Sequence, residues 1–282
     1  MKSMSFKIVV DSCCDLTPQM RKDPCFVKVP LSIHANGSVF VDDDTMDQAD
    51  LLWSMRQSED APSTACPSPQ AYLDAYQGEE GEDVYVVTLS ALLSGSHNSA
   101  EQARVLLEEE QPERNIHVFN SCSASSGEVL AALKIQELAS SGMPFKKVVR
   151  EVEQFIYQMQ TLFVLESLDN LRKNGRLTKL QAVVTSALKI KLLCGATPEG
   201  EICKLGQALS MKQALNKLVE RIAGDPAHKG RTVAICHCGC LDRAFQVKRR
   251  IEETCQAGKI LILEAGGITT VYANEGGIVV AY

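Results

Sequence analysis

Three serines, a glycine and a histidine lie close together in the segment Leu93–Ser99, whose sequence is LSGSHNS. Gly95 permits close approach of a ligand to the backbone. Ser94 and Ser96 offer hydroxyl donors, and a helix beginning here adds unpaired backbone N–H groups and a favourable dipole for an anion. Serine and asparagine are also ordinary helix N-caps, and the spacing alone favours that structural role. The segment is therefore a candidate anion site that needs support from the rest of the chain.

A second candidate is the segment Pro62–Pro69, with the sequence PSTACPSP. Ser68 suits an N-cap and Pro69 suits the first turn of a helix, so a helix is predicted to begin there. The stiff residues before it can present Thr64 to a cleft. A plain loop is the alternative interpretation of the same residues.

Cysteines form further clusters. Cys236–Cys240 reads CHCGC, but zinc sites usually use Cys-x-x-Cys pairs, so buried thiols at the end of a strand are favoured over a metal site. Cys13 and Cys14 are candidates for a reactive thiol, although no histidine adjoins them in sequence. The three aspartates at 42–44 are candidates for binding a divalent cation, and solvated carboxylates on a loop are the favoured alternative.

Hydrolase chemistry is the main catalytic alternative. Ser94 or Ser96 beside His97 suggests an esterase, but the chain has no Gly-x-Ser-x-Gly elbow. Neighbouring residues also rarely point correctly for a nucleophile and its base. No Gly-x-x-x-x-Gly-Lys-Ser/Thr phosphate loop occurs, so the sequence does not indicate ATP use by this chain alone. The residues favour a binding protein, with a serine- or cysteine-dependent esterase as the alternative.

Alternating strand and helix patterns position these loops. Strands are predicted at residues 7–10, 27–33, 39–41, 84–87 and 116–119, with a hairpin at Asn36-Gly37. Helices are predicted at 46–55, from 69, after residue 98 to about 109, and after residue 127 to about 140. Such alternation predicts a mainly parallel sheet, whose strand ends would gather the loops 11–15, 93–99 and 120–127.

The pattern changes after a helix that opens at Pro144. Two short helices are predicted around Asn174-Gly175, followed by an antiparallel hairpin that turns at residues 198–200. A helix from Ser210, a strand at 232–236, a helix to Cys255 and two apolar runs close the chain. We predict two α/β domains, 1–160 with a mainly parallel sheet and 161–282 with a mixed or antiparallel sheet, and a ligand cleft between them.

Composition excludes several classes of protein. Of the 282 residues, 45% are hydrophobic and 23% charged, which is typical of a globular protein. The formal net charge of −6 argues against a nucleic-acid partner. No apolar stretch is long enough for a membrane span or a signal peptide. The eleven cysteines therefore read as reduced thiols, and we expect a cytoplasmic protein.

The motifs together resemble the DegV family, two-domain bacterial proteins that bind a long-chain fatty acid between their domains. The matching segments, in the family's order, are IVVDSCCDL at 8–16, PSTACPSP at 62–69, LSGSHNSA at 93–100, FNSCSASS at 119–126, LDNLRKNGRL at 168–177 and SALKIK at 186–191. Each motif is weak alone, and their shared order and spacing carry the resemblance.

The resemblance implies that Thr64 and Ser94 hold the fatty-acid carboxylate, with Gly95 and the adjoining helix terminus in support. It implies a lipid-binding protein that presents a ligand such as palmitate to a separate fatty-acid kinase subunit. That partner would supply ATP and form the acyl phosphate, with Arg176 as a contact. No catalytic residue, metal or cofactor is expected in this chain. Candidates for lining the acyl tunnel are Leu165, Leu188, Ile190, Leu192 and Leu193, with core packing as the alternative for each.

The chain departs from the family at two places. The C-terminal His-Thr-Gly-Pro-Gly motif, whose histidine belongs to the polar network at the carboxylate, reads here Ala273-Asn274-Glu275-Gly276-Gly277. Asn174 replaces the first glycine of the Gly-Gly-Arg motif. The first departure leaves four interpretations open: weaker binding, a different acyl ligand, a substitute donor such as Asn274, or binding of another small anionic metabolite.

Overall fold

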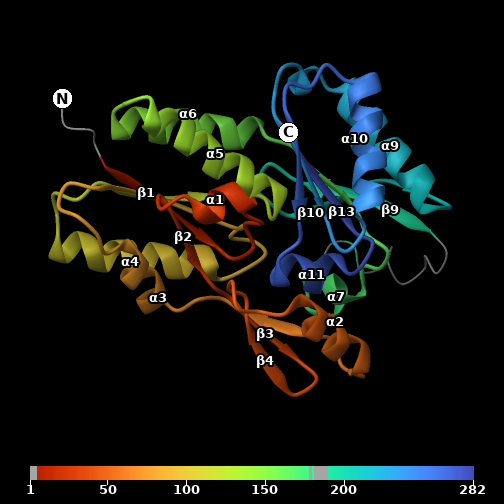
Figure 1. The fold of residues 1–282 in the computed structure, drawn as a ribbon, viewed down its shortest axis with the longest axis horizontal. Helices are drawn as coiled ribbons and strands as arrows, with labels where there is room; N and C mark the ends of the chain where they lie inside the picture. Colours follow the sequence, from red (N-terminus) through yellow and green to blue (C-terminus); the bar gives the residue numbers. More distant parts are fainter. Residues whose placement is uncertain (1–4, 178–179, 181–189) are drawn as a thin grey trace.

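A four-stranded parallel sheet forms in the first half of the chain (Figure 1). The computed structural model describes residues 5–177, 180 and 190–282. The strands of this sheet, in the order β2-β1-β6-β7, are β1 (Phe6–Asp11), β2 (Phe26–Val29), β6 (Asp83–Thr88) and β7 (Ile116–Asn120). All six residues of β6 are buried, as expected for a central strand covered on both faces.

Helices cover both faces of this sheet. On one face lie α3 (Pro69–Tyr76) and α4 (Ser96–Glu110), and on the other lie α5 (Ser126–Ser140) and α6 (Phe145–Gln158). Ser68 caps α3 through Ala71 N, and Pro69 occupies its first turn, which confirms the helix start predicted there. A short helix, α1 (Pro18–Lys22), follows β1.

A six-stranded mixed sheet forms in the second half. Its strands, in the order β10-β9-β8-β13-β11-β12, are β8 (Thr161–Val164), β9 (Lys191–Ala196), β10 (Ile202–Ala208), β11 (Val233–His237), β12 (Ile260–Glu264) and β13 (Ile278–Ala281). Only β11 and β12 pair in parallel. The helical elements among the described residues of this half are α7 (Asp169–Lys173), α9 (Met211–Gly224), the 3-10 turn η2 (Pro226–His228), α10 (Leu241–Thr254) and α11 (Gly267–Ala273). The predicted fold class, two α/β layers with different sheets, is confirmed.

Helix α5 lies between the two sheets. It contacts β1 and β6 on one side and β11 and β13 on the other. Its buried residues belong to a hydrophobic core that continues from Ile8 and Val10 to Ala234 and Ala281. The four-stranded sheet ends at residue 120 and the six-stranded sheet begins at 161, on either side of the predicted division at 160. The domain boundary itself stays a prediction.

A small antiparallel sheet, β4-β3-β5, lies beside both layers. It comprises β3 (Ser32–Ala35), β4 (Ser38–Val41) and β5 (Ser63–Ala65), next to helix α2 (Gln48–Gln57). Asn36 and Gly37 have φ of 50° and 74°, so the predicted hairpin turn is confirmed. The expected single strand at 27–33 is wrong, because the chain leaves the parallel sheet at Pro30 and continues as β3 of the small sheet.

Two elements that line the site were not predicted, β8 and α11. The short helix predicted before Asn174 is α7, whereas the one after it falls largely outside the described residues. None of the described helices is long and apolar enough to cross a membrane.

Candidate functional site

A cavity of about 110 Å³ lies between the two sheets. Its first-half lining comes from the ends of the parallel strands, namely Cys13, Leu89, Leu93 and residues 122–125. Its second-half lining comes mainly from β8, the β9–β10 hairpin and α11. The predicted gathering of the three loops at one edge of the sheet is therefore confirmed.

Hydrogen bonds tie the three loops together. Asp11 Oδ2 accepts from Ser96 Oγ at 2.7 Å and from the backbone N–H of Leu89 at 2.9 Å. Ser90 N donates to Ser123 O at 2.7 Å. Cys122 and Ser125 adopt φ of 49° and 56°, an uncommon backbone conformation for residues other than glycine that is often found at functional sites.

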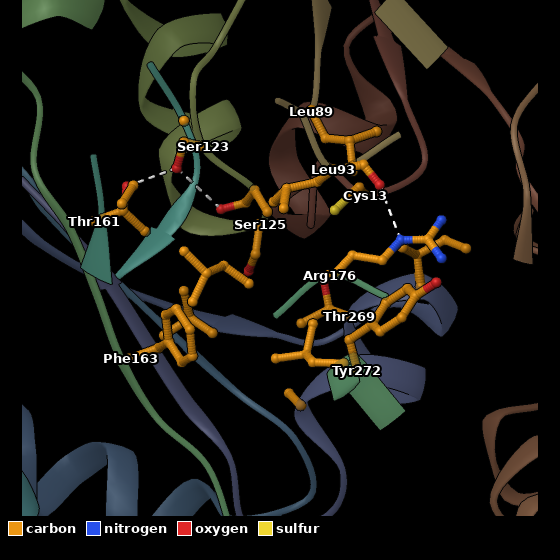
Figure 2. A pocket seen from close by; sticks show the side chains of 18 of the residues that line it. Cys13, Leu89, Leu93, Ser123, Ser125, Thr161, Phe163, Arg176, Thr269 and Tyr272 are labelled. Carbon is orange, nitrogen blue, oxygen red and sulfur yellow. Dashed lines mark hydrogen bonds between the residues drawn. The ribbon is translucent and has the colours of Figure 1, made fainter. Parts of the chain in front are cut away.

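The serine and threonine hydroxyl groups of the wall form hydrogen bonds within the protein. Ser123 Oγ and Thr161 Oγ1 are 2.6 Å apart and share a hydrogen bond (Figure 2). Ser125 Oγ donates to Asp15 Oδ2 at 2.5 Å, and Thr269 Oγ1 donates to the same oxygen at 2.8 Å. The wall therefore presents mainly carbon atoms although serine and threonine contribute to it.

Charge is confined to one end of the cavity. Among the described residues that line it, Arg176 is the only charged one. Figure 2 shows Arg176 and Tyr272 at one end and Thr161 and Phe163 at the other. The Arg176 guanidinium carbon lies 5.8 Å from the centre of the Tyr272 ring, and Arg176 Nε donates to Leu93 O at 3.1 Å. The cavity is thus apolar along its length and cationic at one end.

The residues predicted to bind a carboxylate lie around this cationic end. Thr64 lies in β5, and its Oγ1 is 2.7 Å from the Tyr272 hydroxyl oxygen. Ser94 lies beside Arg176 in an outer groove that also includes Gly95 and His97. A Cβ on Gly95 would lie 3.1 Å from Cys66 Sγ, so the glycine lets the segment after β5 approach the start of α4. The fold therefore brings together Thr64, Ser94, Gly95 and Arg176.

Contacts from the second half hold this end together. Asn174, the residue that departs from the Gly-Gly-Arg pattern, donates through Nδ2 to Pro62 O at 2.9 Å, just before β5. Arg176 lines both the cavity and the outer groove. It is therefore placed to reach a ligand inside and a group outside.

Helix α4 begins at this groove. Its N-cap is Gly95, and Ser94 Oγ accepts a hydrogen bond from Ser96 N at 3.2 Å. Because Ser94 Oγ is the acceptor, its own O–H can still donate to a ligand. Capping and ligand binding are therefore compatible at this serine.

The expected tunnel residues have different positions. Leu165 lines the cavity, whereas Leu192 and Leu193 are buried in the core, so for these two the core alternative holds. Residues 195, 196, 200 and 202 of the β9–β10 hairpin line the cavity instead. Ile190 is partly buried against the core, and Leu188 lies outside the described residues.

The proposed substitute donor Asn274 is not among the lining residues. Its backbone has φ of 55° at the end of α11, and its Oδ1 accepts from Asn170 Nδ2 at 3.3 Å. Two other residues of α11, Thr269 and Tyr272, do line the cavity. The sequence analysis does not identify either of them as a site residue. The sequence signal for this short element is the run GITTVYA at 267–273, which contains no charged residue.

The hydrogen bonds and pKa shifts of the candidate nucleophiles do not support esterase chemistry. Ser96 is fully buried and donates to Asp11, while His97 Nδ1 contacts Thr88 Oγ1 at 3.1 Å instead of a serine. Burial raises the pKa of Cys13 well above that of an ordinary thiol, with Glu128 and Asp11 adding to the shift. Burial and the charge of Glu199 raise the pKa of Cys122. Both thiols are therefore weak nucleophiles at neutral pH.

The cysteines of the CHCGC segment have separate partners. Cys236 Sγ donates to Asp15 at 3.2 Å, Cys238 Sγ to Thr270 Oγ1 at 3.5 Å and Cys240 Sγ to Gly277 O at 3.5 Å. Across the described part of the chain, no group of three His, Cys, Asp or Glu side chains is arranged to hold a metal ion. Asp42 is buried and caps α11 through Gly267 N and Ile268 N, so the expectation of three solvated carboxylates is wrong for this one.

Known proteins share this fold over its full length. A DegV family protein from Ruminococcus gnavus, solved with vaccenic acid, has 46% identity and a TM-score of 0.95, with 100% of both chains covered. The Streptococcus pneumoniae fatty acid kinase (Fak) B3 protein loaded with linoleic acid has 34% identity and a TM-score of 0.90, with 99% of both chains covered.

Sequence comparison agrees with the comparison of structures. A DegV domain-containing protein of Streptococcus pyogenes serotype M3 is 36% identical over 281 residues, 99% of each chain. The family model described as "Uncharacterised protein, DegV family" matches residues 5–282. The resemblance inferred from the short motifs is therefore confirmed, and the chain belongs to the DegV family.

Proposed function

We propose that this chain binds a long-chain fatty acid in the cavity between its two sheets. The observation that carries the proposal is the combination of an apolar cavity with a single charged lining residue, Arg176, at one end. An amphiphile with one anionic head group matches this distribution, because its chain needs apolar contacts and its carboxylate needs a cation or several donors. The relatives solved with vaccenic and linoleic acid support the same ligand class.

The carboxylate is proposed to lie at the Thr64–Arg176 end. Ser94 and the backbone N–H groups at the start of α4 supply donors there, and Gly95 gives a head group room beside them. The acyl chain would extend from this end toward Phe163, which lies at the opposite end of the cavity in Figure 2. Palmitate is a suitable test ligand, and chain length and saturation are left to measurement.

The chain is proposed to act as a binding subunit that presents the carboxylate to a separate fatty-acid kinase. Arg176 supports this role because it borders both the cavity and the outer groove. The S. pneumoniae relative is named as part of a fatty acid kinase. The partner would supply ATP and form the acyl phosphate, while this chain would bind and orient the carboxylate. A cytoplasmic location and the lack of a resident cofactor stay predictions.

Native mass spectrometry of the freshly purified protein tests the binding proposal. We expect one fatty acid per chain, identified after denaturation and extraction. An empty protein that also fails to take up palmitate or oleate would contradict it.

A reconstituted reaction tests the kinase role separately. Loaded protein, the kinase subunit and ATP should yield an acyl phosphate that hydroxylamine traps as the hydroxamate. Loaded protein without the kinase is the control, and its turnover would favour the enzyme alternative.

A further inference from the structure

The pair formed by Thr64 and Tyr272 holds two hydroxyl protons but only one hydrogen bond between its oxygens. The two oxygens are 2.7 Å apart, and either can donate. Whichever group donates to the other, one O–H proton remains for a third group. A carboxylate has only acceptors, so it can take that remaining proton.

The position of each hydroxyl decides which one meets the ligand. Tyr272 lies on α11 and lines the cavity, whereas Thr64 lies on β5 and is not among the described lining residues. A ligand inside the cavity therefore contacts the Tyr272 side chain, whereas Thr64 lies on the far side of the Tyr272 hydroxyl. In this arrangement Thr64 donates to Tyr272, and Tyr272 donates into the cavity.

The positive charge of Arg176 favours the same direction of hydrogen bonding, from Thr64 through Tyr272 to the ligand. The Arg176 guanidinium lies over the Tyr272 ring, 5.8 Å from its centre, and Figure 2 shows the phenol oxygen end of Tyr272 beside it. A carboxylate attracted to Arg176 is thus brought to the phenol O–H. Hydrogen bonds in a chain polarise one another, so donation from Thr64 strengthens the bond that Tyr272 makes to an anion.

We propose that Tyr272 donates a hydrogen bond directly to the ligand carboxylate and that Thr64 is the positioning residue behind it. This inference rests on the proposed fatty-acid binding. It changes the role of Thr64 from a direct ligand to the partner that orients the tyrosine, and it adds a head-group residue from the second half of the chain.

A double-mutant cycle with Tyr272→Phe and Thr64→Val tests the proposal. The measurement is the Kd of delipidated protein for palmitate and, in parallel, for methyl palmitate. Phenylalanine keeps the ring under Arg176 and removes only the hydroxyl. We expect Tyr272→Phe to weaken palmitate binding by about tenfold or more and Thr64→Val to weaken it less. The double variant should bind like Tyr272→Phe alone.

Two controls separate a direct bond from a structural effect. Methyl palmitate lacks the anionic head group, so its Kd should change much less than that of palmitate in Tyr272→Phe. Tyr157→Phe removes a hydroxyl from a tyrosine that is 78% exposed on α6, and it should bind both ligands like the wild type. A carboxyl-¹³C palmitate titration adds an independent readout, because loss of a donor raises the pKa of the bound carboxyl group.

The outcomes distinguish the inference from the function on which it rests. If wild-type protein binds palmitate and Tyr272→Phe binds it equally well, the role of Tyr272 is wrong and the proposed function stands. The role is also wrong if Thr64→Val gives the larger loss and Tyr272→Phe adds nothing to it. If wild-type protein binds no fatty acid, both proposals fail.

Discussion

Thr269 of the second half donates a hydrogen bond of 2.8 Å to Asp15 of the first half, directly behind the cavity wall. The same carboxylate accepts from Ser125 Oγ, Cys236 Sγ and Gly266 N. Burial raises the pKa of Asp15, and these four bonds oppose the shift by stabilising the charged form. One buried carboxylate thus joins the two halves and accepts hydrogen bonds from two wall hydroxyls.

Replacement of Asp15 by alanine should destabilise the protein strongly. The change leaves four donors without their acceptor, and we expect the free energy of unfolding to fall by about 2–4 kcal/mol. Asp15→Asn keeps an acceptor oxygen and should lose less. Urea denaturation of delipidated protein measures both, with the exposed loop variant Glu113→Ala as control. Wild-type stability in Asp15→Ala would contradict this role.

Local chemistry explains what the sequence predicted. The hairpin at Asn36-Gly37 and the helix starts at Ser68 and Ser210 depend on neighbouring residues, and the structure confirms each. The strand predicted at 27–33 includes Pro30, and the chain divides there into two strands because proline interrupts a ladder of hydrogen bonds. Signals within a few residues were therefore sufficient for most elements.

Long-range contacts explain what the sequence did not predict. Thr64 meets Tyr272 across 208 positions of the chain, and no local pattern encodes that pairing. Helix α11 is only seven residues long, and Asp42 of the first half caps it. The family resemblance indicates Thr64 and Ser94, but no motif indicates Tyr272. Its contact with Thr64 depends on how the two halves of the chain pack together.

The stability of the protein should fall with rising pH because of Glu128. Burial, and then the charge of Asp11, raise its pKa well above the ordinary value of 4.5. Above that value the folded protein holds a proton that the unfolded chain releases, so the contribution of Glu128 to stability decreases as pH rises. Glu128→Gln mimics the protonated form and removes this dependence.

Urea midpoints of wild type and Glu128→Gln should therefore diverge between about pH 5 and pH 8, with the variant increasingly the more stable. Asp11 and Asp15 are present in both proteins, so the difference reports residue 128 together with its hydrogen bond to Asp11. Parallel pH profiles would show that Glu128 titrates alike in the folded and unfolded chains.

Removal of the charge at Arg176 should weaken fatty-acid binding in the absence of any partner. We expect Arg176→Met to raise the Kd for palmitate by about tenfold, because a partly buried carboxylate loses its nearest cation. Arg172→Met removes a guanidinium one turn earlier that pairs with Asp169, and it is the matched control. Equal affinities of the two variants would place the head group elsewhere.

The far end of the cavity should set the preferred chain length. Phe163 lies opposite Arg176, so Phe163→Leu lengthens the available space and should shift the preference toward longer acyl chains. Phe119→Leu makes the same change at a buried residue outside the lining. Each variant should lose about 1 kcal/mol of stability. Competition among fatty acids of graded length gives the preference, and a shift in both variants would argue against a specific role for Phe163.

A crystal structure with ω-bromo palmitate tests the central claim most directly, because the anomalous signal of bromine fixes the direction of the chain. We predict a bromine peak near Phe163 and Thr161, with the carboxylate at Arg176, Tyr272 and Ser94. A bromine peak at the Arg176 end, or no ligand density between the sheets at saturating ligand, would contradict the account.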